Sequence, residues 1–230
     1  MGRDVTSGTY SREDRQRYRR KVQQCLDALA AMLNSETFAF HRRHMGLEIE
    51  LNLVDEKLDP AMTNTVVLEK IADPDFTLEL GQHNIELNVR PRPLDGDEAL
   101  ELEQDLRASL TRANAKAHDA GSDLVMIGIL PTLTEEHFDA RWLSPSSRYT
   151  VLNERIFAAR GEEMLLNMEG EPMPGRQPDR LRSYAESILP EAACTSAQLH
   201  LQVAPEDFAA HWNAAQCLAE IGRASCRERV

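Results

Sequence analysis

The composition of the chain excludes several classes of protein. Its 230 residues are 42% hydrophobic and 28% charged, which is usual for one large or two small globular domains with a sizeable core. The formal net charge of −12 argues against nucleic acid as the main partner, because binding to a phosphate backbone requires Lys and Arg. A small phosphate-bearing substrate stays compatible with this charge, since metal ions neutralise phosphates locally.

The sequence indicates a cytoplasmic protein without a membrane partner. No apolar run approaches the roughly 20 residues that a membrane-spanning helix needs. The segment Met1–Tyr10 is polar and lacks the apolar core of a signal peptide. The cysteines are scattered without paired spacing, and we expect them to be reduced thiols. They are Cys25, Cys194, Cys217 and Cys226.

The first third of the chain predicts a helix, a strand and a second, shorter helix. Ser11 is a suitable N-cap for the first helix, and Asp14 three residues later gives an imperfect capping box. Apolar residues then recur at helical spacing. The predicted ranges are a helix over 11–33, a strand over 45–54, a turn over 55–60 and a helix over 65–72.

Two short apolar segments next along the chain predict a hairpin. Phe76–Leu80 and Ile85–Arg90 are joined by Gly81–Asn84, and four residues containing Gly and Asn suit a hairpin loop. Proline ends the second strand, because it lacks the N–H that a ladder needs.

The rest of the chain mixes helices and strands without a regular alternation. The predicted elements are a helix over 96–120 ended by Gly121, a buried strand over 123–130, a helix over 146–160, a Gly- and Pro-containing loop over 161–180, a short helix over 181–188, a strand over 195–203 and a helix over 205–221. This order favours an α+β fold with a largely antiparallel sheet and flanking helices.

The last nine residues, GRASCRERV, differ from the sequence before them. They are basic and poor in apolar residues, and they begin where the helix predicted over 205–221 ends. We expect residues 222–230 to be a non-native tail and residues 1–221 to be native sequence. A natural polar tail is the alternative.

Acidic residues gather on one side of the strand predicted over 45–54. Side chains of a strand alternate between its faces, so Glu48 and Glu50 point the same way, opposite the apolar residues at 47, 49, 51 and 53. Alone, this pattern is also typical of an amphipathic strand with one solvated face.

The predicted hairpin strengthens the case for a functional face. If Gly81–Asn84 is the loop, Leu80 pairs with Ile85 and Glu79 lies directly opposite Glu86. Two carboxylates facing each other across a strand pair repel, so their placement suggests a bound cation. Oxygen ligands of this kind suit Mg²⁺ or Mn²⁺ better than Zn²⁺.

The strand predicted over 195–203 adds a third polar face. Gln198, His200 and Gln202 share one side of it, opposite apolar residues. A lone histidine in a strand is more often structural than a ligand. Because glutamines flank His200 on a wholly polar face, it becomes a candidate site residue.

In their order along the chain, these motifs resemble the glutamate–cysteine ligase family. The motifs are Gly46-Leu-Glu-Ile-Glu50, Glu79 with Glu86 seven positions later, and Gln198-Leu-His200. The family belongs to the glutamine-synthetase-like carboxylate–amine ligases, and the match covers most of residues 40–205. The resemblance implies a glutamine-synthetase-like catalytic core.

The resemblance also implies a role for each acidic residue. Glu50, Glu79 and Glu86 would hold one Mg²⁺ (or Mn²⁺) ion. Glu48 and His200 would hold a second ion, which needs one further Glu that the family places later in the chain. Family members are markedly longer, so the resemblance implies that this chain is the N-terminal part of one incomplete catalytic domain.

The implied activity is ATP-dependent formation of an amide bond, as in glutathione biosynthesis. ATP would phosphorylate the γ-carboxylate of glutamate, and the amine of cysteine would attack the acyl phosphate. Arg148, in a segment that resembles a family helix near the substrate pocket, would meet a substrate carboxylate or a phosphate. Gln198 and Arg90 are candidates for cofactor binding. Solvated positions are the alternative for both arginines.

Two alternative functions stay open. One is a ligase of the same superfamily that uses another amine or acid. The other is a truncated, inactive fragment that at most binds metal or nucleotide, because the last metal ligand is missing. A truncated sheet is also expected to leave an unpaired edge.

Overall fold

The computed structural model describes residues 9–35, 37–38 and 43–227. The fold is α+β, as expected, with antiparallel strand pairs and flanking helices. The chain forms two compact units. The larger contains Leu47–Arg90 and Leu100–Leu199, and the smaller contains Thr9–Gly46, Pro91–Ala99 and the chain from His200 onward.

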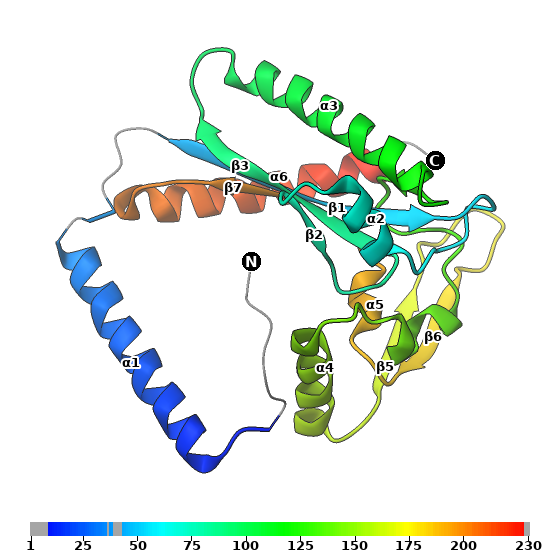
Figure 1. Ribbon diagram of the computed structural model, residues 1–230, viewed down its shortest axis with the longest axis horizontal. Helices are drawn as coiled ribbons and strands as arrows, with labels where there is room; N and C mark the ends of the chain where they lie inside the picture. Colours follow the sequence, from blue (N-terminus) through cyan, green and yellow to red (C-terminus); the bar gives the residue numbers. More distant parts are fainter. Residues whose placement is uncertain (1–8, 36, 39–42, 228–230) are drawn as a thin grey trace. The chain divides into compact units, whose positions relative to one another are not determined.

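The main sheet of five strands is organised around one central strand, β1 (His44–Val54) (Figure 1). The order is β2–β3–β1–β4, and β7 also pairs with β1. β4 takes up only the end of β1, where Asn52 lies opposite Val125. The other strands are β2 (Phe76–Leu78), β3 (Asn84–Pro93), β4 (Asp123–Val125) and β7 (Ala197–Leu201).

One face of this sheet forms the larger apolar core. The odd-numbered residues of β1 from Leu47 to Leu53 are buried, together with Ile85 and Leu87 of β3. Two helices cover them, α2 (Asn64–Ile71) and α3 (Glu98–His118). The buried stripe of α3 follows helical spacing, at Leu102, Leu106, Leu110, Ala113 and Ala117.

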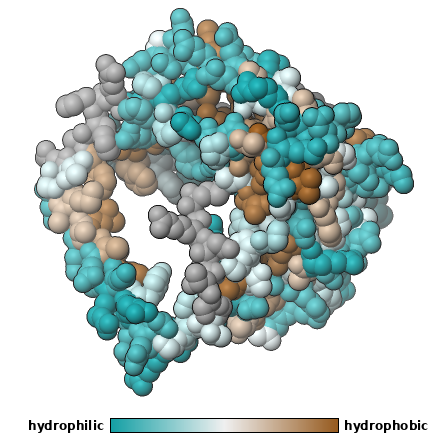
Figure 2. Space-filling model, viewed as in Figure 1, coloured by the Kyte–Doolittle hydropathy of each residue, from teal (hydrophilic) through white to brown (hydrophobic). Residues whose placement is uncertain are grey.

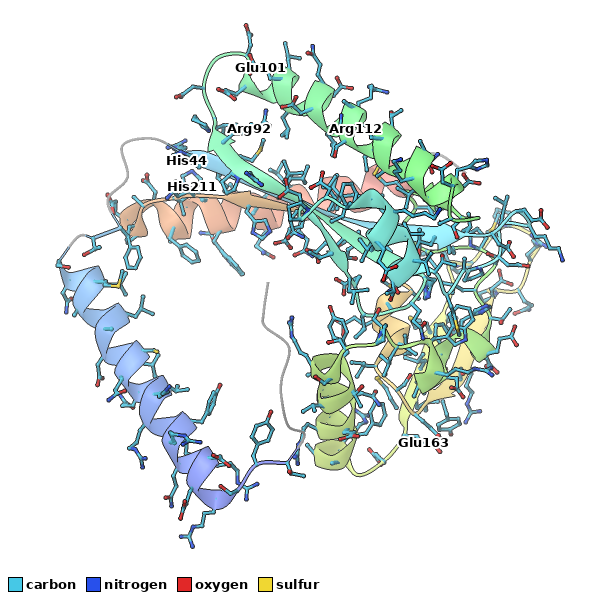
Figure 3. All side chains as sticks on the ribbon, viewed as in Figure 1. His44, Arg92, Glu101, Arg112, Glu163 and His211 are labelled. Atoms are coloured by element: carbon cyan, nitrogen blue, oxygen red, sulfur yellow. The ribbon has the colours of Figure 1, made fainter. Side chains whose placement is uncertain are left out.

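The outer side of α3 is polar. Glu101 and Arg112 are exposed, and Figure 3 shows them along the helix. Gly121 ends this segment with a positive φ of 80°, a conformation that glycine adopts at little cost. The alternation of buried and exposed residues explains why the sequence predicted this helix to within two residues at each end.

A second apolar cluster joins the loop before β3 to elements that follow β4. Its buried members come from that loop, from the segment 140–143 and from residues 188–192, which include α5 (Leu189–Ala192), and α4 (Ser147–Arg160) packs against them. Figure 1 shows α4 and α5 on the opposite side of the sheet from α3. The buried residues are Leu80, Leu143, Ile188, Leu189 and Ala192.

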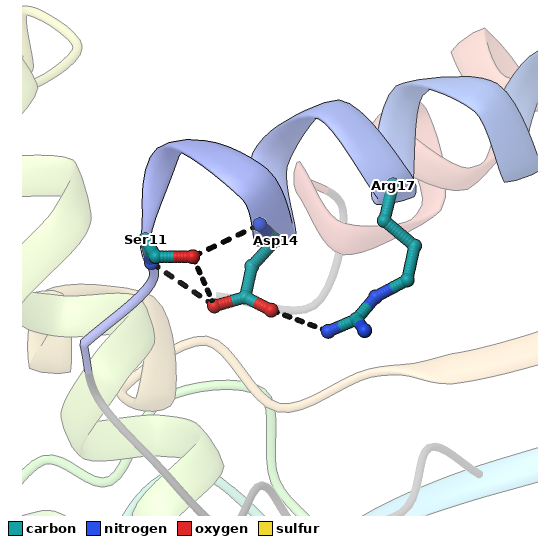
Figure 4. A network of polar contacts seen from close by, with 3 residues as sticks. All are labelled: Ser11, Asp14 and Arg17. Carbon is teal, nitrogen blue, oxygen red and sulfur yellow. Dashed lines mark hydrogen bonds and ion pairs between the residues drawn. The ribbon is translucent and has the colours of Figure 1, made fainter.

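The smaller unit contains two long helices, α1 (Arg12–Asn34) and α6 (Phe208–Arg227). Ser11 caps α1 as predicted, and Asp14 completes the capping box (Figure 4). No residue of α1 is buried. Its first half is charged and teal in Figure 2, and its second half carries exposed apolar residues.

Two polar contacts tie the ends of β1 and β7 together in this unit. The backbone N–H of Gln202 donates to the carbonyl of His44 at 2.9 Å. The His44 Nδ1 and Gln202 Oε1 atoms are also 2.9 Å apart. The side chain of His44 is labelled at the start of β1 in Figure 3.

The register predicted for the hairpin is wrong by two residues. Thr77, not Glu79, lies opposite Glu86, and Leu78 pairs with Ile85. Strand β2 stops at Leu78 because the next residues pair elsewhere. The carbonyl of Leu80 accepts the N–H of Ser144 at 2.9 Å, and Gly81 forms a bridge with Leu143.

The prediction of a buried strand over 123–130 is also wrong. Only Asp123–Val125 forms a strand, and its residues are half-buried. Met126 is 67% exposed, and Ile129 is exposed as well. The apolar composition of this segment suggested burial, but the sheet offers it pairing only at the end of β1.

Residues 161–180 and 181–188 differ most from prediction. The loop and short helix expected there are instead a two-stranded hairpin, β5 (Met164–Glu169) and β6 (Arg180–Ala185). Gly175, with a φ of 79°, lies in the connection. Gly161 ends α4, and the other Gly and Pro residues that predicted a long loop lie in the connection between β5 and β6.

The last helix is longer than predicted. A 3₁₀ turn over Pro205–Asp207 leads into α6, which continues to Arg227 and so includes part of the segment expected to be a tail. Among the described residues, no helix has both the length and the apolar character needed to cross a bilayer.

The loop before β3 joins several elements through the backbone of two residues. The backbone N–H of Gln82 donates to the carbonyl of Trp142 at 2.7 Å, and its carbonyl accepts the backbone N–H of Asn64 at 3.1 Å. The carbonyl of His83 accepts the N–H of Leu53 at 2.7 Å. The His83 ring is 1% exposed and lies edge-on to Trp142, with ring centroids 5.7 Å apart.

The buried ring of His83 resists protonation. Neither ring nitrogen has a hydrogen-bond partner among the described residues. Burial, with a smaller effect from the charge of His137, lowers the pKa of His83 to about 4. The neutral ring is therefore the form that packs in this loop.

We expect replacement of Ser11 by Ala to destabilise α1. The loss of the cap leaves first-turn N–H groups unsatisfied, at a cost of about 1 kcal/mol. Hydrogen exchange of the amides in the first turn of α1 should accelerate several-fold. Gln16→Ala, at an exposed position of the same helix, should leave these rates unchanged; equal acceleration would contradict the capping role.

We expect the free energy of unfolding to fall in acid because of His83. Its pKa is lowered from 6.5 to about 4, so its contribution is complete above pH 6.5 and is lost as the pH falls toward 4. The slope is about 1.4 kcal/mol per pH unit. In urea unfolding between these pH values, His83→Phe should remove this dependence. The exposed His118→Phe should not, and a slope unchanged by His83→Phe would contradict the assignment.

Candidate functional site

The polar face of β1 opens onto a pocket of about 310 Å³. The strand, the loop before β3, α4, and the chain from α5 to β7 all contribute to its wall. Carboxylates dominate its polar lining, and none of its lining residues is Lys, Arg or His. The lining residues are Glu50, Glu79, Leu80, Asn84, Tyr149, Leu152, Glu191, Ala192, Cys194, Thr195, Ser196 and Gln198.

Glu50 is fixed by the segment that leads into β7. Its Oε2 accepts the backbone N–H of Ser196 at 2.8 Å, and its own N–H donates to the Ser196 carbonyl at 2.9 Å. The other carboxylate oxygen, Oε1, accepts the side-chain amide of Gln198 at 3.2 Å. Gln198, the candidate for cofactor binding, therefore lies beside a predicted metal ligand and is its hydrogen-bond donor.

Three predicted metal ligands influence one another electrostatically. The pKa of Glu79 is raised to about 7 by burial, by its hydrogen bond with Glu86, and by the charges of Glu86 and Glu50. The backbone N–H of Leu80 opposes this shift by donating to Glu79 Oε1 at 2.8 Å. Glu50, Glu79 and Glu86 therefore form one acidic cluster on this face.

The two-residue error in register leaves this cluster intact. A shift of two residues keeps every side chain on the same face of the strand, whereas a shift of one would reverse it. Thr77 takes the position opposite Glu86, and Glu79 lies beyond the end of β2. Glu86 itself is only 7% exposed, so its carboxylate is the most buried of the three.

Tyr149 adds a phenol to the pocket from α4. Its hydroxyl donates to the carbonyl of Leu78 at 3.2 Å. Burial and the charge of Glu79 raise its pKa to about 12, so it stays a neutral donor. Arg148 precedes it and is exposed, with its guanidinium 5.6 Å from the centroid of the Tyr149 ring. Arg148 thus lies next to a pocket residue without lining the pocket.

Buried asparagine side chains form hydrogen bonds next to the pocket, and one of them, Asn84, lines it. Asn84 donates its side-chain N–H to Asn52 Oδ1 at 3.0 Å, and Asn52 donates to the carbonyl of Ile127 at 3.0 Å. Asn64 reaches the hydroxyl of Ser144 at 2.7 Å. All three asparagines are fully buried. Asn52 lies between two leucines, which was an available signal, whereas Asn64 and Asn84 lie in polar surroundings in the sequence; sequence reasoning missed all three.

The two predicted ligands of a second ion, Glu48 and His200, lie in different compact units. Glu48 is half-buried on β1 and belongs to the larger compact unit. His200 is exposed on β7 and belongs to the smaller unit. A shared ion between these two side chains stays a prediction.

Arg90 lies outside the pocket lining. It is exposed within β3, three residues before the strand ends, and its guanidinium pairs with Asp75 at 3.3 Å. Glu191 was not predicted, although it contributes a third carboxylate to the lining. It follows a proline in the four-residue helix α5, where no alternating pattern marks the side that it faces.

The acidic cluster offers carboxylate oxygens, which hard cations prefer, but its side chains are not arranged around one ion position. Within the described residues, no three His, Cys, Asp or Glu side chains are placed so that they could hold one metal ion. The oxygens of Glu50 and one oxygen of Glu79 are instead turned toward amide N–H groups. A cation would have to draw these carboxylates away from neutral donors.

Comparisons of this chain with protein-family models, with curated proteins and with solved structures give no match. The site therefore has to be interpreted from its own residues.

We expect Glu79→Gln to stabilise the protein at pH 8. The pKa of Glu79 is raised from 4.5 to about 7, so its stabilising contribution is present below pH 4.5 and is lost as the pH rises through 7. The amide keeps an acceptor for Leu80 but carries no charge. The gain should be about 1–3 kcal/mol, or roughly 3–10 °C in Tm.

Thermal unfolding at pH 5 and pH 8 checks this prediction. The advantage of Glu79→Gln should shrink at pH 5, where the wild-type carboxyl is largely protonated. Glu163→Gln removes an exposed carboxylate outside the pocket and is the matched control. A loss of stability in Glu79→Gln at pH 8 would show that its ionised form is favourable as it stands.

Proposed function

We propose that the chain carries the cation- and phosphate-handling part of an ATP-dependent carboxylate–amine ligase, with glutamate and cysteine as the first substrates to test. The acidic pocket is the observation that carries the proposal. Burial, the hydrogen bond with Glu86 and the charges of Glu86 and Glu50 together raise the pKa of Glu79 to about 7. A divalent cation would offset both the burial and the repulsion of these carboxylates, and Mg²⁺ prefers carboxylate oxygens.

The proposed roles combine the acidic cluster with the ligands that the sequence predicted. Glu50, Glu79 and Glu86 would hold Mg²⁺ or Mn²⁺, which when bound supplies positive charge for the oxygens of ATP. Gln198 and the Ser196 N–H would orient Glu50, as outer partners of metal ligands usually do. Glu48 and His200 remain the proposed ligands of a second ion.

The pocket wall supports a polar substrate in this proposal. Tyr149 offers a neutral phenol, and Arg148 beside it would meet a carboxylate or a phosphate as the substrate enters. Arg90 is already paired with Asp75, so we give it less weight as a phosphate ligand. Another amine in place of cysteine would use the same acidic face.

Binding of a cation or nucleotide without catalysis is a second candidate. It is favoured by the absence, within the described residues, of three side chains already arranged around one metal position. Its distinguishing feature is binding of Mn²⁺ or Mg–ATP without consumption of ATP.

The two candidates are separated by measuring ADP release and Mn²⁺ binding with the 230-residue chain. A ligase should release ADP only when Mg²⁺, glutamate and a suitable amine acceptor are all present. Calorimetry should show that Glu50→Gln weakens Mn²⁺ binding by about tenfold or more, with a smaller effect of Glu48→Gln on this ion. Glu163→Gln should bind like the wild type.

Distinct outcomes bear on each part of the proposal. Mn²⁺ binding without ADP release across a panel of amine acceptors would reject ligation and leave the binding function. The acidic cluster would be contradicted as a cation site if the chain did not bind Mn²⁺, or if Glu50→Gln and Glu163→Gln lowered the affinity for Mn²⁺ equally.

A further inference from the structure

Strand β7 lies at an edge of the main sheet. Within the part of the chain that the structure describes, β1 is its one strand neighbour. All five of its residues are exposed, and none of them is Asp, Glu, Lys, Arg or Pro. Natural sheets usually protect such edges with Lys, Pro or a covering element.

The backbone contacts of β7 show which groups face outward. Ser196 O and Gln202 N, on either side of the strand, bond to β1 residues. Along a strand, the N–H and C=O groups of successive residues point to alternate sides. Since residues 196 and 202 bond to β1, the even-numbered residues of β7 direct these groups toward β1. The corresponding groups of Ala197, Leu199 and Leu201 therefore point away from the sheet.

The side chains of these residues extend the apolar face of the sheet beyond its covered part. Gln198 points to the pocket face, where it reaches Glu50, so Leu199 lies on the opposite face. That is the face on which Leu47 and Ile49 are buried. Leu199 is nevertheless 72% exposed, and Leu201 is exposed too.

We propose that this edge pairs with the same edge of a second copy of the chain, joining two sheets across an antiparallel β7–β7 contact. A twofold axis at Leu199 places Leu199 opposite its counterpart and Ala197 opposite Leu201. Both are apolar pairs, and they use the outward-facing backbone groups. Gln198 falls opposite His200, which is a polar pair on the other face.

Self-complementarity favours a second copy over an unrelated strand. A twofold contact needs a surface that matches itself, and this pairing opposes no two like charges within the strand. The net charge of −12 on each chain acts against association at long range. Added salt should therefore strengthen the dimer by screening that repulsion.

Sedimentation velocity over a range of concentrations tests the contact. The wild type should form a dimer, more tightly at higher salt, and Leu199→Lys should raise the dissociation constant by about tenfold or more, because two ammonium groups would face each other. Leu100→Lys, at a 65% exposed leucine of α3, is the matched control and should dimerise like the wild type.

Hydrogen exchange identifies the strand that is covered. The amides of Ala197, Leu199 and Leu201 should be unprotected in the monomer and protected in the dimer. Equal effects of Leu199→Lys and Leu100→Lys would overturn the proposal. So would a chain that stays monomeric at all concentrations, a dimer in which these amides still exchange freely, or protection of these amides in the monomer.

Discussion

The alternation of side chains along β1 is the constraint on which the larger unit depends. Its odd-numbered residues from Leu47 to Leu53 are apolar and buried under α2 and α3. Because successive side chains of a strand point to opposite faces, Glu48, Glu50 and Asn52 share the face opposite the apolar core. The core and the candidate site are therefore two consequences of one pattern.

Burial of that second face raises the free-energy cost of ionising Glu79 in the acidic cluster. On an open sheet, solvent would screen these charges and leave the titration of Glu79 near normal. Here α4, α5 and the chain entering β7 wall the face, so ionisation of Glu79 becomes unfavourable. Amide donors satisfy Glu50 in part, whereas Glu86 is nearly buried beside Glu79. The burial and mutual repulsion of these carboxylates are the reasons for proposing a cation there.

The parts of the fold that could be predicted are those set by local sequence. The capping box at Ser11, the helix α3 and the alternation in β1 each depend on neighbouring residues, and each was predicted. The site residues Glu50, Glu79 and Glu86 were predicted for the same reason. Their shared face survived the wrong register because an even shift preserves it.

The parts that could not be predicted depend on distant partners. Strand β2 ends early because Leu80 and Gly81 pair with residues 143 and 144. The hairpin of β5 and β6 has no alternating pattern, and exposed residues predominate in both strands. Tyr149 and Glu191 reach the pocket from helices whose orientation no local pattern specifies.

The central claim is that Glu50, Glu79 and Glu86 form one repelling cluster that a divalent cation relieves. The most direct measurement is the titration of the Glu79 side-chain carboxyl by carbon-13 NMR, without and with Mg²⁺. The account predicts a midpoint near pH 7 without the ion, and a clear downward shift when Mg²⁺ is added. A midpoint close to 4.5, unchanged by Mg²⁺, would contradict it.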